Sequence, residues 1–256
     1  MADILLTTLN ARYFHAAFGL RYLFANLGAL RSRARIVEFE INQRPVDIAE
    51  ALLDRNPKIL GVGVYIWNVA PALEVVATVK RVRPEVVVVL GGPEVSYELE
   101  SQPIAALADY IITGEADLEF ARLCAAILAG NRPPGRVIEA SPPEIASLVL
   151  PYELYSAEDI AHRIIYVEAS RGCPFHCEFC LSSLDIPVRQ AHLPAFLASL
   201  DGLLNRGARH LKFVDRTFNL NLGASRAILE FLLERYQPGL FFHFEMVPDR
   251  LPPELR

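Results

Sequence analysis

Three of the four cysteines in this chain lie within eight residues, in the stretch RGCPFHCEFC. They are Cys173, Cys177 and Cys180, with the spacing C-x3-C-x2-C, whereas Cys124 lies far away in the sequence. Three clustered thiols cannot all pair with one another as disulfides. Three thiolates can instead hold three irons of a cubane iron–sulfur cluster and leave one iron open to another ligand. A zinc site completed by His176 or a distant ligand is the alternative, although structural zinc sites usually show two separated ligand pairs.

The composition limits the class of protein. The chain has 256 residues, of which 52% are apolar and 21% are charged, so we expect a folded protein large enough for two domains. A net charge of −5 argues against nucleic acid as a partner. No apolar run approaches the roughly 18 residues of a membrane span, and no signal segment opens the chain. Few, clustered cysteines then predict a cytoplasmic protein.

The first part of the chain alternates strand-like and helix-like patterns. Strands are predicted at 3–9, 34–40, 58–67, 86–90 and 110–113, and helices at 15–30, 46–55, 69–83 and 117–129. Several strand candidates are continuous runs of Val, Ile and Leu, as expected for parallel strands buried on both faces. The pattern predicts an α/β fold with a doubly wound parallel sheet of the flavodoxin or Rossmann type.

A proline-rich stretch and a second βα series follow. We expect a domain over residues 1–130, a linker over 131–150 and a second domain over 151–256. The linker contains five Pro and Gly breakers, Pro133, Pro134, Gly135, Pro142 and Pro143, and Pro151 follows directly after it. In the second domain, strands are predicted at 164–169, 211–214 and 240–246, and helices at 193–205 and 224–236. Three such units cannot close a (β/α) barrel of eight, so we expect the first half of one in a chain that looks truncated at its C-terminal end.

Distinctive residues follow the predicted strand ends of the first domain. Ligands of doubly wound sheets bind at the carboxyl ends of the strands. The segments there are 10–15, 65–68, 91–94 and 114–115, and the candidate binding residues within them are Tyr13, His15, Tyr65, Trp67, Gly91, Gly92, Pro93, Gly114 and Glu115. The single tryptophan, Trp67, either forms a wall for a cofactor or covers the apolar edge of the sheet.

The cysteine motif, with the aromatic Phe179 before its last cysteine, resembles the cluster motif of radical S-adenosylmethionine (SAM) enzymes. The similarity continues through SRGCPFHCEFCLSS (170–183), KFVDRTFN (212–219) and HFEMVPD (243–249). The segments after the strands of the first domain resemble the cobalamin-binding domain that precedes many radical SAM barrels. Over essentially its whole length, the chain therefore resembles the cobalamin-binding-domain-containing radical SAM proteins.

This resemblance implies cofactors and a type of reaction. Cys173, Cys177 and Cys180 would ligate a 4Fe–4S cluster, and S-adenosylmethionine would bind its fourth iron. Reductive cleavage would give a 5′-deoxyadenosyl radical for methyl transfer or a related radical reaction on an unknown small-molecule substrate. The electron donor would be a protein such as a flavodoxin or a ferredoxin. No catalytic residue is assigned by the sequence.

The resemblance also assigns residues to S-adenosylmethionine. Phe179 would lie beside the adenine, while Asp215 and Thr217 would help to hold the methionyl amino group. Packing in the core is an equal alternative for Phe179. For Asp215 the alternative is a buried ion pair with Arg171 or Arg216.

Cobalamin is implied with one departure from the family pattern. Cobalamin domains that ligate cobalt through histidine carry D-x-H-x-x-G after the first strand, whereas here His15 lacks the aspartate that would orient its ring. An exposed or helix-capping role for His15 is the alternative. The cobalamin tail would pass Gly91 and Gly92, where absent side chains allow close backbone approach.

Two further hypotheses stay open. One is a non-catalytic module that binds the cluster or cobalamin and works only with a partner chain. The other is a fragment without independent activity, because an open half-barrel leaves a strand edge and apolar faces exposed.

Overall fold

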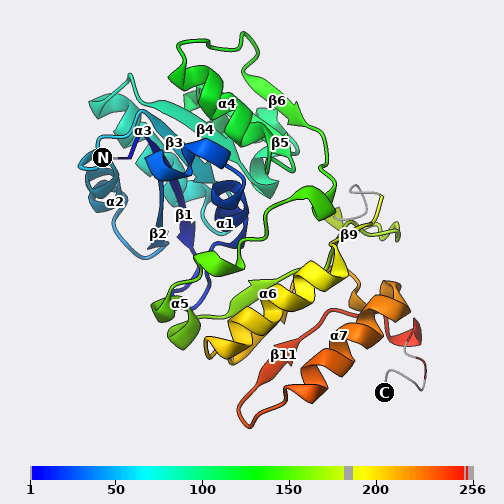
Figure 1. Cartoon of the computed structure of the whole chain (residues 1–256). Coiled ribbons are helices and arrows are strands. Elements are labelled where there is room, and N and C mark those ends of the chain that lie inside the picture. Colours follow the sequence, from blue (N-terminus) through cyan, green and yellow to red (C-terminus); the bar gives the residue numbers. More distant parts are fainter. Residues whose placement is uncertain (1, 182–186, 251, 253–256) are drawn as a thin grey trace. The chain divides into compact units, whose positions relative to one another are not determined.

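The computed structural model describes residues 2–181, 187–250 and 252, and the chain divides into two compact units. The first comprises Met1–Pro143 and the second Glu144–Arg256. Figure 1 shows the first unit in blue to green and the second in green to red. Each unit is described by itself below.

The first unit is built on a six-stranded, fully parallel sheet. Its strands are β1 (Ile4–Asn10), β2 (Ala34–Glu40), β3 (Ile59–Gly63), β4 (Val87–Gly91), β5 (Tyr110–Gly114) and β6 (Val137–Ala140). Their order in the sheet is β2-β1-β3-β4-β5-β6. The first five follow the 2-1-3-4-5 order of the flavodoxin-like folds, which reverses direction between β1 and β3 and so creates a binding crevice there.

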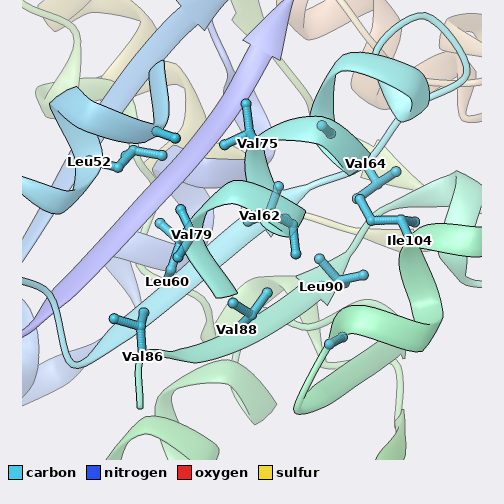
Figure 2. Packing of buried hydrophobic residues seen from close by; sticks show 14 of the residues in the cluster. Leu52, Leu60, Val62, Val64, Val75, Val79, Val86, Val88, Leu90 and Ile104 are labelled. Atoms are coloured by element: carbon cyan, nitrogen blue, oxygen red, sulfur yellow. The ribbon is translucent and has the colours of Figure 1, made fainter. Parts of the chain in front are cut away.

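Helices cover both faces of this sheet. They are α1 (Phe18–Ala25), α2 (Pro45–Leu53), α3 (Val69–Val82) and α4 (Glu119–Leu128). Leu60 and Val62 of β3 lie on one face of the sheet and pack with α2 and α3. Ile59 lies on the opposite face, which packs with α1 and α4. Figure 2 shows the first of these cores, in which valines and leucines of β3, β4 and α3 interdigitate. Each fully buried Val or Leu contributes about 1.5–3 kcal/mol, so the two cores hold the strands rigidly under the loops.

The predicted elements of this unit agree with the structure, with three differences. Helix 15–30 is interrupted, because α1 ends at Ala25 and Gly28 adopts a positive φ of 55° before a 3-10 helix at Gly28–Arg33. Strand 58–67 ends early, at Gly63. The stretch predicted as a linker contains β6, which pairs with β5 and packs only Ile138 and Ala140 toward the core, so its four residues give too short a pattern for the sequence to reveal.

The second unit contains a three-stranded parallel sheet in the order β11-β10-β7. Its strands are β7 (Ile165–Val167), β10 (His210–Phe213) and β11 (Phe241–His243), and its helices are α5 (Ala157–His162), α6 (Leu193–Asn205) and α7 (Leu222–Glu234). Phe196 of α6 packs edge-on against Phe213 of β10 at 6.1 Å. A short antiparallel pair, β8 (Ser170–Arg171) and β9 (Arg189–Gln190), lies at the two ends of the cysteine loop. All three predicted strands and both predicted helices of this unit are present.

In the part of the chain that the structure covers, no helix is both long and apolar enough to span a membrane.

Candidate cofactor sites

The candidate cobalamin residues gather at one edge of the first sheet. Because β1, β3, β4 and β5 are parallel, the loops that follow them lie at the same edge, which we call the carboxyl edge. Three polar side chains fix these loops: Asn68, Glu38 and Ser96.

Asn68 joins the ends of β1 and β3. It is fully buried, and its amide nitrogen donates to Thr8 Oγ1 at 3.0 Å and to the carbonyls of Leu9 and Gly63 at 3.1 and 3.2 Å. Its amide oxygen accepts from the backbone N–H of Tyr65 at 2.8 Å. These bonds turn the chain out of the sheet after Gly63, which explains why the predicted strand ends early.

The turn that Asn68 holds carries two stacked aromatic rings. The rings of Tyr65 and Trp67 lie 4.6 Å apart and 6° from parallel, and Trp67 is 47% exposed. Burial, and then the negative charge of Glu38, raise the pKa of Tyr65 above its ordinary value of 10.0, so its hydroxyl stays protonated. The pair offers a flat apolar surface that a large planar ligand can cover. The role of Trp67 as a wall for a cofactor stays a prediction.

Glu38 of β2 fixes the loop that follows β1. Its two oxygens accept from the Arg21 guanidinium, the Asn10 amide and the backbone N–H of Ala17, each at 2.7 Å. The Arg21–Glu38 pair is buried, with side chains 5% and 9% exposed. A buried charge pair needs such hydrogen bonds to offset its desolvation, so β1, β2 and the start of α1 are tied together here.

The loop fixed by Glu38 carries Tyr13 and His15. Tyr13 is 40% exposed, and the half-buried ring of His15 lies 4.4 Å from that of Phe14. The backbone N–H of His15 donates to the carbonyl of Arg12 at 3.1 Å, which closes a turn.

The glycines lie at the ends of β4 and β5. Gly92 has a φ of 113°, and a Cβ on it would lie 2.4 Å from the carbonyl oxygen of Val64, so only glycine fits. The Ser96 hydroxyl donates to the carbonyl of Gly92 at 2.9 Å and accepts from the N–H of Gly114 at 3.3 Å. Gly91 is the last residue of β4, Pro93 begins a 3-10 helix, and Glu115 is half-buried beside Gly114.

All nine predicted cobalamin residues thus lie on loops at or next to the carboxyl edge. The sequence pattern does not single out Asn68, Glu38 or Ser96, which hold those loops in place. A polar residue at the end of an apolar run was the available signal, and it is too common to select these three.

The cysteine loop follows β7 in the second unit. Cys173 is buried, Cys180 is half-buried and Cys177 is exposed. Among the residues that the structure describes, no three His, Cys, Asp or Glu side chains lie close enough to hold a metal ion, so the three sulfurs are not gathered. The donor set nevertheless fits an iron–sulfur cluster chemically, because it consists of three cysteine thiols, the ligands that such clusters take.

Buried charges anchor the start of this loop. The carboxylate of Asp215, after β10, accepts from the N–H of Ala169 at 3.0 Å and from the Ser170 hydroxyl at 2.6 Å. Burial raises the pKa of Asp215 above its ordinary value of 3.8, and these hydrogen bonds partly oppose that rise. The ion pair between Arg171 and Asp215 that the sequence offered as an alternative does not form. Instead, Nε of Arg171 donates to Glu168 at 2.7 Å.

The other two residues assigned to S-adenosylmethionine lie in different surroundings. Phe179 is 95% exposed, so packing in the core, the alternative considered from the sequence, is wrong. Thr217 is buried, and its hydroxyl oxygen lies 4.0 Å from the sulfur of Cys173. The structure therefore places Asp215 and Thr217 against the beginning of the cysteine loop, and leaves Phe179 on the surface of that loop.

Comparison with known proteins bears on both units. Residues 4–124 match the model of the B12 binding domain. The matched segment, 121 of the 256 residues, is similar to the B12 binding domain family. It contains β1 to β5 together with the whole carboxyl edge described above.

A curated relative and two solved structures extend over both units. The chain is 28% identical over 219 residues to an uncharacterized methyltransferase, PH0819, of Pyrococcus horikoshii, which covers 76% of this chain and 46% of the relative. The radical S-adenosylmethionine methyltransferase TsrM of Kitasatospora setae, solved with cobalamin and a [4Fe-4S] cluster bound, has a TM-score of 0.67 at 17% identity, over 92% of this chain and 51% of that one. The cobalamin-dependent S-adenosylmethionine radical enzyme OxsB, solved with aqua-cobalamin, has a TM-score of 0.71 at 18% identity, over 93% of this chain and 38% of that one.

These similarities confirm the predicted fold class and the predicted family resemblance. The chain has the fold of the corresponding part of the cobalamin-dependent radical S-adenosylmethionine enzymes. It spans about half the length of the relatives that it matches, or less.

Proposed function

We propose that this chain binds cobalamin at the carboxyl edge of its first unit and a 4Fe–4S cluster through Cys173, Cys177 and Cys180 in its second. We propose further that it belongs to an enzyme that uses S-adenosylmethionine for methyl transfer or a related radical reaction on a small molecule. One observation carries this proposal: a B12 binding domain and a C-x3-C-x2-C loop at the end of the next unit's first strand occur in one chain.

The residues of the first unit suit a corrinoid. The stacked rings of Tyr65 and Trp67 provide an apolar surface, and Gly92 lets the backbone after β4 pass close to Val64 at the same edge. His15 lacks an orienting carboxylate in the D-x-H pattern, so we assign it contact with the ligand rather than ligation of cobalt.

The residues of the second unit suit a cluster and S-adenosylmethionine. When bound, the cluster supplies the electron for reductive cleavage of S-adenosylmethionine, and cobalamin supplies methyl transfer. Cys177 and Cys180 lie toward the surface, so the loop has to draw its thiols together around iron, while Cys173 is already fixed. Phe179, exposed on the same loop, is available to pack against the adenine. The electron would come from a flavodoxin- or ferredoxin-like donor.

Iron binding tests the cluster assignment. The whole chain, reconstituted anaerobically with iron and sulfide, is expected to hold about four irons and to become brown. Cys177→Ala should lose the cluster, whereas Cys124→Ala, a matched change at the buried remote cysteine, should keep it. Tightly bound zinc in place of iron, or equal iron in both variants, would show that the assignment is wrong.

Corrinoid binding tests the first unit separately. Trp67→Ala is expected to weaken hydroxocobalamin binding by roughly tenfold, which corresponds to about 1.4 kcal/mol of lost ring contact. Tyr236→Ala removes an exposed aromatic ring from the second unit and should leave the affinity unchanged. Equilibrium dialysis with absorbance detection measures both, and equal affinity in the two variants would move the corrinoid site away from Trp67.

Cleavage of S-adenosylmethionine tests catalysis. The reduced, reconstituted chain should release 5′-deoxyadenosine, and the release should disappear in Cys177→Ala. A chain that carries the cluster and cobalamin but releases none would support a binding module that acts with a partner chain.

A further inference from the structure

The contact between Thr217 and Cys173 joins two segments that are 44 residues apart in sequence. The Thr217 hydroxyl oxygen lies 4.0 Å from the Cys173 sulfur, within the range of a weak hydrogen bond to sulfur, and both residues are buried. Of the three cysteines in the motif, Cys173 is the buried one. It is therefore the sulfur whose surroundings the protein controls most closely.

Thr217 is held firmly by its own neighbours. The backbone N–H of the next residue, Phe218, donates to the carbonyl of Glu245 at 2.8 Å. The carbonyl of Phe218 accepts from the Ser225 hydroxyl at 2.6 Å. Asn219 exchanges two hydrogen bonds with the backbone of Val247, at 2.8 and 3.0 Å. The backbone of residues 217–219 is thus fixed to the segment after β11 and to α7.

Cys173 is held from the other side. Asp215 fixes Ala169 and Ser170, and the short β8–β9 pair closes the base of the loop at Ser170 and Arg171. Both partners of the contact are therefore fixed before any metal arrives. Cys177, four residues further on, is exposed.

We propose that Thr217 is a positioning residue for Cys173. The Thr217 hydroxyl donates a hydrogen bond to the Cys173 sulfur once that sulfur is a thiolate bound to iron. Such a bond withdraws electron density from the sulfur and raises the reduction potential of an iron–sulfur cluster. This inference rests on the proposed cluster binding. It gives Thr217 a role that differs from the contact with the methionyl amino group expected from the sequence.

The test compares the midpoint potential of the cluster between the wild-type chain and variants at Thr217. Each whole chain is reconstituted anaerobically and measured without S-adenosylmethionine. Thr217→Val keeps the branched shape and removes the donor, so the potential should fall while the iron content stays the same. Thr217→Ser keeps the donor and should retain the wild-type potential. If the valine variant folds poorly, Thr217→Ala removes the same donor with a smaller side chain.

The outcomes separate the two levels of the proposal. Equal potentials in wild type, Thr217→Val and Thr217→Ser, with equal iron, would overturn the role of Thr217 and leave cluster binding intact. A difference that arises only after S-adenosylmethionine is added would also overturn it, because it would place Thr217 against that ligand. A wild-type chain that takes up no iron would remove the cluster assignment, and this inference with it.

Discussion

The four cysteines occupy surroundings that separate them chemically. Cys124, a residue of α4, packs inside the core, and its burial raises the pKa of its thiol to about 12. Cys173 is buried under Thr217, whereas Cys177 is exposed. A reactive cysteine must be both accessible and ionised, so the order of reactivity follows from the structure.

Thiol labelling of the metal-free chain should reproduce this order. At pH 8 only about one in 10⁴ Cys124 side chains is a thiolate, and the core excludes the reagent as well. We expect Cys177 to react first and Cys124 to react only after unfolding, as followed by mass spectrometry of peptides from a time course. Labelling of Cys124 at the rate of Cys177 in the native chain would contradict its burial.

Asp215 gives a prediction with a definite sign. Its pKa is raised in the folded state, so its contribution to stability is present below about pH 4 and is lost as the pH rises through the folded pKa. Asp215→Asn does not titrate and keeps one oxygen to accept from Ala169 and Ser170. The free energy of unfolding of the wild type should therefore fall relative to that of Asp215→Asn as the pH rises from 4 to 8.

Urea denaturation at several pH values measures this difference. Asp215→Ala serves as the comparison, because it leaves the Ala169 N–H and the Ser170 hydroxyl unsatisfied and should be about 2 kcal/mol less stable than Asp215→Asn at every pH. A difference between wild type and Asp215→Asn that does not change with pH would mean that Asp215 is not desolvated.

At the scale of elements, the carboxyl edge depends on side chains that join strand ends. Asn68 spans β1 and β3, Glu38 spans β1, β2 and α1, and Ser96 spans the loops after β4 and β5. The sheet fixes where the loops begin, and these three residues fix how they turn. Any ligand at this edge therefore meets a surface that is already formed.

Asn68→Ala should destabilise the first unit and loosen its aromatic turn. The change leaves the Tyr65 N–H and several carbonyls without their partner, so we expect a loss of about 3 kcal/mol in the free energy of unfolding. Trp67 is the single tryptophan, so its fluorescence during urea denaturation reports directly on this edge. Asn131→Ala, at an exposed position, is the control and should change the midpoint little.

A second consequence concerns the ligand. Because the Tyr65–Trp67 turn is then less fixed, Asn68→Ala should also bind hydroxocobalamin more weakly than Asn131→Ala does. Unchanged affinity in a folded Asn68→Ala chain would show that Asn68 supports the fold without shaping the site.

The sequence predicted the elements well where burial leaves a periodic pattern. The runs around Leu60 and Val88 are buried on both faces and were readily assigned as parallel strands. β6 was missed because it is mostly exposed and is held by backbone pairing with β5. The end of β3 was missed because a single tertiary contact, from Asn68 back to Thr8, decides it.

The candidate sites show the same division. Glycine at 92 and the cysteine spacing were visible because chemistry or backbone geometry restricts the residue type. The contact of Thr217 with Cys173 was not visible, because it joins segments far apart in the chain. The assignment of the three cysteines to a cluster stays a prediction until iron is measured.

For the whole molecule, the division into two units predicts two unfolding steps. The cores of the first unit lie within residues 1–143, and the second unit has its own aromatic core around Phe196 and Phe213. A ligand stabilises only the unit that binds it. In calorimetry of the whole chain, hydroxocobalamin should therefore raise one unfolding temperature and leave the other in place.

The assignment of that transition can be checked with the same single tryptophan. The transition that shifts should be the one in which Trp67 fluorescence changes. A single transition that moves as a whole on addition of the corrinoid would instead mean that the two units unfold together.

The position of β1 has a consequence for handling the protein. This strand is fully buried and hydrogen-bonded to β2 on one side and β3 on the other. The segment ILLTTLN therefore lacks one of its two strand neighbours until residue 63 has been made, which leaves an apolar strand edge exposed during translation. Deleting residues 1–10, or fusing a bulky tag to them, would therefore disrupt the interior of the sheet rather than its margin.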